Sequence, residues 1–256
     1  MEMSCFPYII LFIYGCALGS FFNVVGLRLP LKQSIIKPRS ACPTCGHQLK
    51  AYELIPMVSY MIQGGKCRGC KSRISPIYPF FELLTGILFM TAPLVIGWSG
   101  ELVVALTLIS MFMLIIVSDI HYMLIPDKIL IWFAGIFLLE RIFWPLNPWW
   151  DSLLGAVSGF ILLLLIAVVS KGGMGGGDVK LYALLGLVLG FKLVLLSFFL
   201  STLFGAVIGG LALLFKIVKR RQPIPFGPFI GAGTLTAYYW GSDLINLYIH
   251  FLNQGF

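Results

Sequence analysis

The sequence contains few charged residues: Asp, Glu, Lys and Arg together make up only 11% of its 256 residues. Soluble globular domains carry roughly 25% charged residues, so this composition excludes a soluble enzyme. The 18 basic residues outnumber the 10 acidic ones and give a formal net charge of +8, but so few cations argue against a nucleic acid partner. Six cysteines in a chain of this length also exclude a disulfide-dense secreted domain.

Long apolar runs dominate the sequence instead, and 59% of its residues are hydrophobic. A membrane-spanning helix needs about 20 apolar residues, because a rise of ~1.5 Å per residue has to cover ~30 Å of hydrocarbon. Eight such runs lie near residues 8–27, 79–97, 102–118, 128–145, 152–170, 179–196, 197–215 and 226–252. We therefore expect an all-α polytopic membrane protein with about eight transmembrane helices in the lipid bilayer.

The sixth and seventh runs follow each other with almost no polar break. The turn between them would consist only of residues 190–192, in which glycine is the one residue that favours a sharp reversal. If these residues form no turn, the number of spans falls to seven.

Three runs contain pairs of glycines four residues apart, namely Gly15 with Gly19, Gly155 with Gly159, and Gly205 with Gly209. Glycines at this spacing share one helix face and let two helix backbones approach closely in lipid. We interpret all three pairs as helix-packing positions.

Residues 29–78 differ from the rest of the chain because they combine prolines, four cysteines and eight basic residues. We expect them to form a small extramembrane domain. A first transmembrane helix at residues 1–28 would precede it, and a membrane domain of about seven helices at residues 79–256 would follow. Since segments rich in Lys and Arg are not readily translocated, the small domain should lie in the cytoplasm.

Charge placement also predicts the orientation of the chain. With residues 29–78 inside and eight spans alternating, only Arg141 and Lys192 of the 18 basic residues fall on the outer side. This distribution favours eight spans and an amino terminus outside. The residues before the first run include Glu2 and no Lys or Arg, so the first run is expected to be a retained span and not a secretory signal.

Two Cys-x-x-Cys pairs, Cys42 with Cys45 and Cys67 with Cys70, are separated by 21 residues. Each pair forms a tight turn that presents two thiolates to one ion, and four thiolates make a closed tetrahedral site. We predict structural zinc, whose binding would stabilise a domain that has little apolar core. Two disulfides, an iron centre or four unrelated thiols are the alternatives, although the reducing cytoplasm disfavours disulfides. His47 could replace one cysteine as a ligand.

Two aspartates stand at the ends of apolar runs, where an ionisable residue is by default a functional candidate. Asp119 closes the third run, and Asp178 opens the sixth after the glycine-rich residues 172–177. The alternation of spans puts both on the cytoplasmic side. Two carboxylates that share a site hold one proton between them. We predict Asp119 and Asp178 as the catalytic pair of an aspartic protease, without assigning which is the acid and which the base.

Other interpretations of these acids compete with catalysis. Helix capping is preferred for Asp127 after Pro126 and is compatible with catalysis at Asp178, but it fits poorly at Asp119, which ends a helix. A phosphate-binding loop at residues 172–177 would lack its usual Lys-Ser/Thr ending. A proton-coupled membrane transporter would need carboxylates near the midplanes of spans, whereas these lie at one interface.

On the basis of the two aspartates and the two cysteine pairs, the chain resembles the type IV prepilin peptidases. These are bifunctional leader peptidase/N-methyltransferases of the intramembrane aspartyl protease class. The motifs that carry the resemblance follow the family order and cover almost the whole length. They are Gly19-Ser-Phe-Phe-Asn23-Val, Arg28-Leu-Pro30, Cys42-Pro-Thr-Cys45-Gly-His47, Glu53-Leu-Ile-Pro56, Gly65-Lys-Cys67-Arg-Gly-Cys70, Tyr78-Pro-Phe-Phe-Glu82-Leu-Leu-Thr-Gly86, Asp119 with Ile125-Pro126-Asp127, Met174-Gly175-Gly-Gly177-Asp178-Val-Lys180-Leu, and Pro225-Phe226-Gly227-Pro228.

The resemblance implies cleavage of a short basic leader, after a glycine, from type IV prepilin or pseudopilin substrates at the cytoplasmic face of a bacterial inner membrane. It implies that the new amino terminus is then methylated from S-adenosylmethionine. The catalytic pair carries over onto Asp119 and Asp178, and methylation is associated with residues 29–78 without assigned methyl-donor ligands. Many relatives have Asp-x-Asp-His where this chain reads Asp119-Ile-His121-Tyr122. A peptidase without methyl transfer is the alternative.

Overall fold

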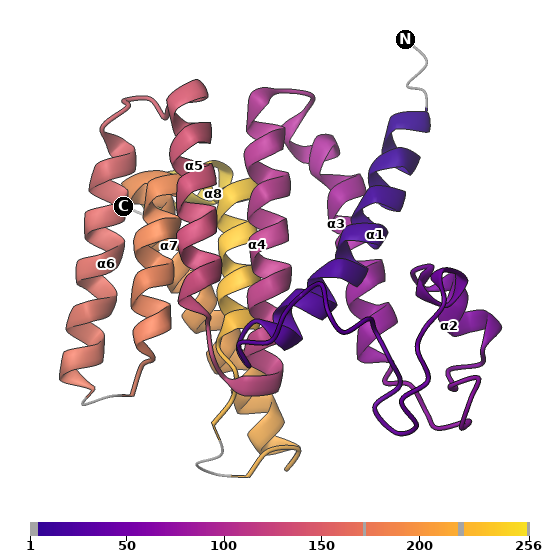
Figure 1. Cartoon of the computed structure of the whole chain (residues 1–256). Helices are drawn as coiled ribbons and strands as arrows, with labels where there is room; N and C mark the ends of the chain where they lie inside the picture. The colour runs from indigo at the N-terminus through magenta and orange to yellow at the C-terminus, as the bar shows by residue number, and fades with distance from the viewer. Residues whose placement is uncertain (1–4, 171–172, 220–222, 255–256) are drawn as a thin grey trace. The chain divides into compact units, whose positions relative to one another are not determined.

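The computed structural model describes residues 5–170, 173–219 and 223–254 (Figure 1). Within these ranges the chain forms helices and no strand, which confirms the all-α fold. The elements are α1 (Phe6–Arg28), the 3₁₀ helix η1 (Ala51–Leu54), α2 (Val58–Ile62), α3 (Ile77–Ile96), α4 (Gly100–Tyr122), α5 (Asp127–Phe143), α6 (Asp151–Val169), α7 (Gly176–Leu214) and α8 (Gly227–Gln254). Some residues used in the orientation and glycine-loop predictions lie outside the described residues: Glu2, Lys171, Gly172, Arg220 and Arg221.

Five helices of the described chain are long and apolar enough to cross a membrane, namely α1, α3, α4, α6 and α7. They support a multi-pass membrane protein. The shorter α5, of 17 residues, and α8 stand where the fourth and eighth spans are expected. The count of eight spans therefore stays a prediction. The chain divides into two compact units, Met1–His121 and Tyr122–Phe256.

In the first unit, α1 and α3 pack against each other in antiparallel register. The pairs that face each other are Asn23 with Tyr78, Gly19 with Glu82, and Gly15 with Gly86. A Cβ atom at Gly15 would lie 2.8 Å from the Cα of Gly86, so only glycine permits this approach. The packing role predicted for Gly15 and Gly19 is confirmed.

In the second unit, α7 is a helical hairpin whose two arms meet at Gly190, which has φ 77° and ψ 177° and is not helical. The hydroxyl of Tyr182 on the first arm donates a 3.0 Å hydrogen bond to Oγ of Ser201 on the second. Residues 19 positions apart in a straight helix are separated by about 28 Å, so this contact requires the chain to reverse. The turn predicted between the sixth and seventh runs is confirmed, and it is centred on the glycine.

The helices α5, α6 and α8 all pack on this hairpin. Gly155 and Gly159 of α6 face the backbone of the first arm of α7 at Gly186 and Tyr182, so this second glycine pair is also a packing position. In the last turn of α5 the Arg141 guanidinium donates a 2.6 Å hydrogen bond to the Val188 carbonyl of α7. Since α5 begins beside Lys180 and ends beside Val188, it runs parallel to the first arm of α7, as alternate spans should.

Candidate functional site

The four cysteines of the two Cys-x-x-Cys pairs come together in the first unit. Their sulfur atoms all lie within 4.8 Å of one another, with Cys42 and Cys70 3.8 Å apart and Cys45 and Cys67 3.9 Å apart. No disulfide joins them. A tetrahedral ion with metal–sulfur bonds of ~2.3 Å holds its ligands about 3.8 Å apart. The cluster therefore has the geometry to hold a metal ion.

Two backbone turns of matching structure present these sulfurs. In each turn the carbonyl of the first cysteine accepts a hydrogen bond from the N–H of the residue four positions later. The N–H of the same cysteine donates to the carbonyl of the residue five positions later. The bonds are Gly46 N to Cys42 O, Cys42 N to His47 O, Lys71 N to Cys67 O, and Cys67 N to Ser72 O, at 2.9–3.0 Å. The fifth residue of each turn is left-handed, with φ 71° at Gly46 and 61° at Lys71.

Ser72 affects the pKa values of two cysteines of the cluster. Its hydroxyl lies 3.0 Å from the sulfur of Cys70 and 3.6 Å from that of Cys42. This hydroxyl and nearby backbone N–H groups lower the pKa of Cys42 to about 5, and the same hydroxyl lowers the pKa of Cys70. At Cys45 the His47 backbone hydrogen bond lowers the pKa, but hydrogen bonds with the other cysteines, Cys70 foremost, outweigh it and raise the value to about 11. Four adjacent sulfurs cannot all ionise without a cation, so the cluster is suited to exchange protons for a metal ion.

Glu53 connects the two cysteine turns. Its carboxylate is buried, accepts a 2.9 Å hydrogen bond from the Lys50 N–H, and lies 3.3 Å from Nε2 of His47 and 3.9 Å from Nε of Arg68. His47 belongs to the first turn and Arg68 to the second. The hydrogen bond from Lys50 is the main reason that the pKa of Glu53 falls below its usual value. His47 faces this carboxylate and is not part of the four-sulfur cluster.

The first predicted catalytic residue, Asp119, lies in the last turn of α4 and is only 6% exposed. The preceding turn packs on α1, because a Cβ at Gly26 would lie 2.8 Å from Cγ1 of Val117. The neighbouring His121 donates from Nδ1 to the Val117 carbonyl at 2.9 Å, as a residue closing a helix does. Asp119 is thus a carboxyl group held at the end of a buried helix in the first unit.

The second predicted catalytic residue, Asp178, is the third residue of α7 and belongs to the second unit. Its N–H donates to the Gly175 carbonyl at 3.1 Å, and a Cβ at Gly175 would lie 3.2 Å from its Oδ2, so the carboxylate folds back over a residue without a side chain. A Cβ at Gly177 would lie 3.0 Å from Cβ of Ile125, which packs tightly there. The two aspartates stand in different units, and their pairing stays a prediction.

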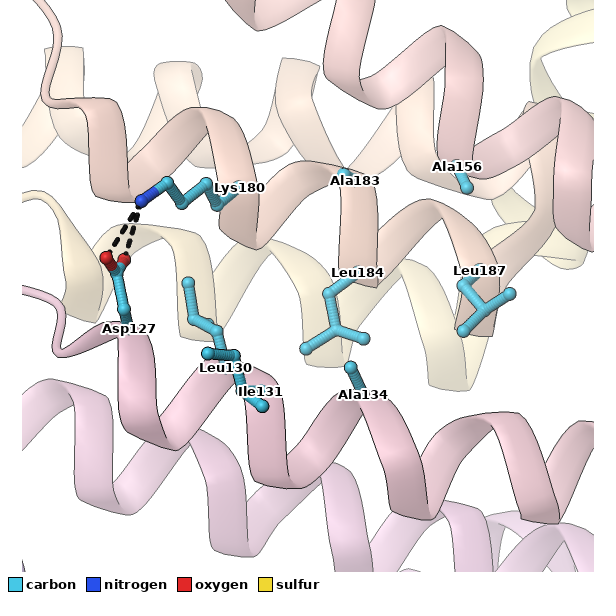
Figure 2. Close-up of a pocket in the computed structure, with 9 residues that line it drawn as sticks. All are labelled: Asp127, Leu130, Ile131, Ala134, Ala156, Lys180, Ala183, Leu184 and Leu187. Carbon is cyan, nitrogen blue, oxygen red and sulfur yellow. Dashed lines mark hydrogen bonds and ion pairs between the residues drawn. The ribbon is translucent and has the colours of Figure 1, made fainter.

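Asp127 forms an ion pair with Lys180. Both of its carboxylate oxygens lie 2.9 Å from Nζ of Lys180, and both side chains are more than half exposed (Figure 2). Asp127 occupies the first turn of α5, as expected of an acid at a helix N-terminus, but its partner was not expected. The pair closes one end of an apolar groove of about 460 Å³ formed by α5, α6 and α7. Its other lining residues are Leu130, Ile131, Ala134, Ala156, Ala183, Leu184 and Leu187.

Comparison with known proteins identifies the family. Residues 13–96 match the bacterial peptidase A24 N-terminal domain, and residues 106–210 match the type IV leader peptidase family. The chain is 48% identical to a prepilin leader peptidase/N-methyltransferase of Bacillus subtilis over 94% of its own length and 97% of the relative. It is 33% identical to the protein of that name in Pseudomonas aeruginosa, over 93% and 91% of the two lengths. No solved structure matches the chain. The chain therefore belongs to the type IV leader peptidase family.

Proposed function

We propose that the chain is a prepilin leader peptidase/N-methyltransferase, which cleaves the leader of type IV prepilin or pseudopilin substrates and methylates the new amino terminus. The observation that carries this proposal is the identity of 48% to the Bacillus subtilis enzyme over nearly the full length of both chains. The apolar helices suit an enzyme of the bacterial inner membrane. The excess of Lys and Arg in residues 29–78 favours cleavage on the cytoplasmic side, with the amino terminus outside.

Asp119 and Asp178 are the proposed catalytic residues. The ionised carboxylate of the pair takes a proton from water as its oxygen attacks the scissile carbonyl. The protonated carboxyl group donates a hydrogen bond to the oxyanion and then passes its proton to the leaving amine. Two features support the pair: Asp119 ends an apolar helix, and Ile125, six residues after it in the sequence, packs on Gly177 beside Asp178.

The glycine-rich turn before Asp178 is suited to an extended substrate. Gly175 and Gly176 carry no Cβ, and a Cβ built at Gly176 would meet nothing within 4 Å. A backbone free of side chains leaves its N–H and C=O groups open to pair with those of a peptide. We propose that the residues around the scissile bond bind along this turn.

The four-cysteine cluster is the proposed zinc site. Sulfur separations of 3.8 and 3.9 Å fit tetrahedral zinc, and a set of four thiolates leaves no position for substrate or water. Zinc there would stabilise the fold of residues 29–78 without taking part in cleavage. S-adenosylmethionine would supply the methyl group that the new amino terminus receives, and we assign this step to residues 29–78.

The test is to incubate the purified full-length chain in lipid vesicles with a type IV prepilin and S-adenosylmethionine, and to analyse the products by mass spectrometry. Cleavage after a glycine, together with the mass of one added methyl group, is expected. Absence of cleavage by a zinc-loaded preparation would contradict the peptidase assignment. Cleavage without added mass would remove the methyltransferase. Metal analysis should find about one zinc ion per chain.

A further inference from the structure

Residues 54–62 expose an apolar cluster that is out of place in a water-facing domain. Met61 and Ile62 are 74% and 71% exposed. The exposed apolar side chains of this segment are Leu54, Ile55, Val58, Met61 and Ile62. In the short α2 helix no residue is buried. Several exposed apolar side chains within one short segment mark a contact with a partner or with a membrane.

The contacts of Met57 fix the position of this segment along the membrane helices of the first unit. Its sulfur lies 3.9 Å from the sulfur of Cys16 in α1, and its N–H donates a 2.7 Å hydrogen bond to Oε2 of Glu82 in α3. Glu82 faces Gly19 in the α1–α3 register. Met57 therefore lies beside residues 16–19 of α1 and not beyond the end of that helix.

This position corresponds to the depth of lipid hydrocarbon. Arg28 ends α1 and marks one interface, because a basic residue at the end of a span lies among the headgroups. At ~1.5 Å per residue, Gly19 is about 13 Å and Cys16 about 18 Å along the helix from Arg28. One leaflet contributes about 15 Å of hydrocarbon. These distances run along the helix axis, so helix tilt shortens the corresponding depths.

In hydrocarbon each backbone polar group needs a partner within the protein, and several N–H groups of this segment have one. Ser59 and Met61 donate to the carbonyls of Ile55 and Met57 at 3.1 and 3.0 Å. Met57 has a φ of 58° and stands between η1 and α2, so its N–H is not part of either helix. The buried carboxylate of Glu82 accepts that N–H.

We propose that residues 54–62 form a membrane-inserted segment, whose exposed apolar side chains contact acyl chains of the leaflet that contains Arg28, and that Glu82 holds it in place. Lys50 and Lys66 flank the segment on either side in sequence and match the negative headgroups of anionic phospholipid. The occupant of the apolar face is thus lipid. This inference depends on α1 and α3 spanning the membrane and not on the reaction that the protein catalyses.

Hydrophobic photolabelling of the unmodified full-length protein tests the proposal. A carbene reagent that partitions into hydrocarbon is activated in vesicles of phosphatidylcholine with phosphatidylglycerol, and the labelled residues are mapped by mass spectrometry. Val58, Met61 and Ile62 should be labelled as strongly as Ile13 and Phe21 of α1, which are 59% and 50% exposed. Labelling should be about tenfold above that of residues 66–73, because the reagent avoids water.

Labelling of residues 58–62 no stronger than that of residues 66–73 would overturn the proposal. Labelling that disappears at a high ratio of protein to lipid would also overturn it, since a second copy of the chain would then cover this face. A pair of variants tests Glu82 separately by amide hydrogen exchange. Glu82→Ala should speed exchange of the Met57 N–H several-fold and lower labelling of α2, whereas Glu82→Gln, which keeps an acceptor oxygen, should preserve both. Equal exchange in the two variants would contradict the role of Glu82.

Discussion

The two cysteine turns differ at one residue in a way that affects stability. Both place a left-handed residue four positions after their first cysteine, but one has Gly46 there and the other Lys71. A left-handed conformation costs a residue with a Cβ about 1–2 kcal/mol, whereas glycine adds about 0.5–1 kcal/mol of unfolded-chain entropy. The first effect is larger, so the glycine is favoured.

Lys71→Gly should therefore stabilise residues 29–78, here called the cysteine domain, by about 0.5 kcal/mol, and Gly46→Ala should destabilise them by a similar amount. The measurement is the denaturant concentration at which the four cysteine sulfurs become reactive in the metal-loaded protein. Lys66→Gly is the control, because Lys66 is not left-handed and should gain nothing. A Lys71→Gly variant that is less stable than the Lys66→Gly variant would contradict the argument.

Glu53 predicts a pH dependence whose sign follows from its lowered pKa. A carboxylate whose pKa is lower in the folded state contributes stability above its unfolded pKa of about 4.3 and loses it as pH falls toward the folded value. Glu53→Gln should thus destabilise the domain near neutral pH, and the gap to the wild type should narrow below about pH 4. Thermal unfolding from pH 7 to pH 3 checks this. Acid also protonates the cysteines in both proteins, so the prediction concerns only the difference in stability between the wild type and Glu53→Gln.

Sequence spacing is sufficient to predict the cluster of Cys42, Cys45, Cys67 and Cys70, because the two pairs are local motifs. It does not predict Glu53 or Ser72 as their neighbours. A serine or a glutamate in a polar segment carries no periodic or spacing signal, and its partner is defined only when the turns fold. The ion pair of Asp127 with Lys180 is missed for the same reason, since 53 residues separate its members.

Among the elements, the α7 hairpin depends most clearly on one residue. Gly190 adopts φ 77°, and a Cβ built there overlaps the carboxylate of Asp151. Gly190→Ala should lower stability by about 2 kcal/mol or more, because it adds this overlap to a backbone penalty of about 1–3 kcal/mol for a residue with a Cβ at this φ and ψ. Gly210→Ala is the matched control within α7: its Cβ would meet nothing within 4 Å, and alanine favours a helix by roughly 1 kcal/mol. Thermal unfolding in bicelles distinguishes them, and equal midpoints would contradict this role of Gly190.

Most helices coincide with the apolar runs, because length and hydrophobicity together determine a span. The run at residues 152–170, for example, becomes α6 at Asp151–Val169. The short α2 is not predicted, since five residues are too few for a helical period to stand out. The position of α2 beside α1 and α3 depends on the contacts of Met57 with Cys16 and Glu82. No local pattern in the sequence predicts these contacts.

At the scale of the whole molecule, the positive charge of residues 29–78 predicts that the amino terminus lies outside. Cys5 is exposed just before α1, and Cys45 and Cys70 are exposed in the cysteine domain. In intact spheroplasts an impermeant maleimide should label Cys5 alone, and Cys5→Ser should remove that label. Cys45 and Cys70 should react only after the cells are opened and the metal is chelated. Labelling of these two in intact cells would reverse the predicted orientation.

Asp119 and Asp178 belong to different units of the chain, and we propose that they act as one catalytic pair. The most direct test measures prepilin cleavage by Asp119→Asn, Asp178→Asn and the double variant, with Asp127→Asn as a control that should keep near wild-type activity. Each single variant should lose at least about 10²-fold in rate, since each removes half of the acid–base machinery. The double variant should be no slower than the worse single one, because the two act as a unit. Substantial cleavage by either single variant, or rate losses that multiply in the double variant, would contradict the claim.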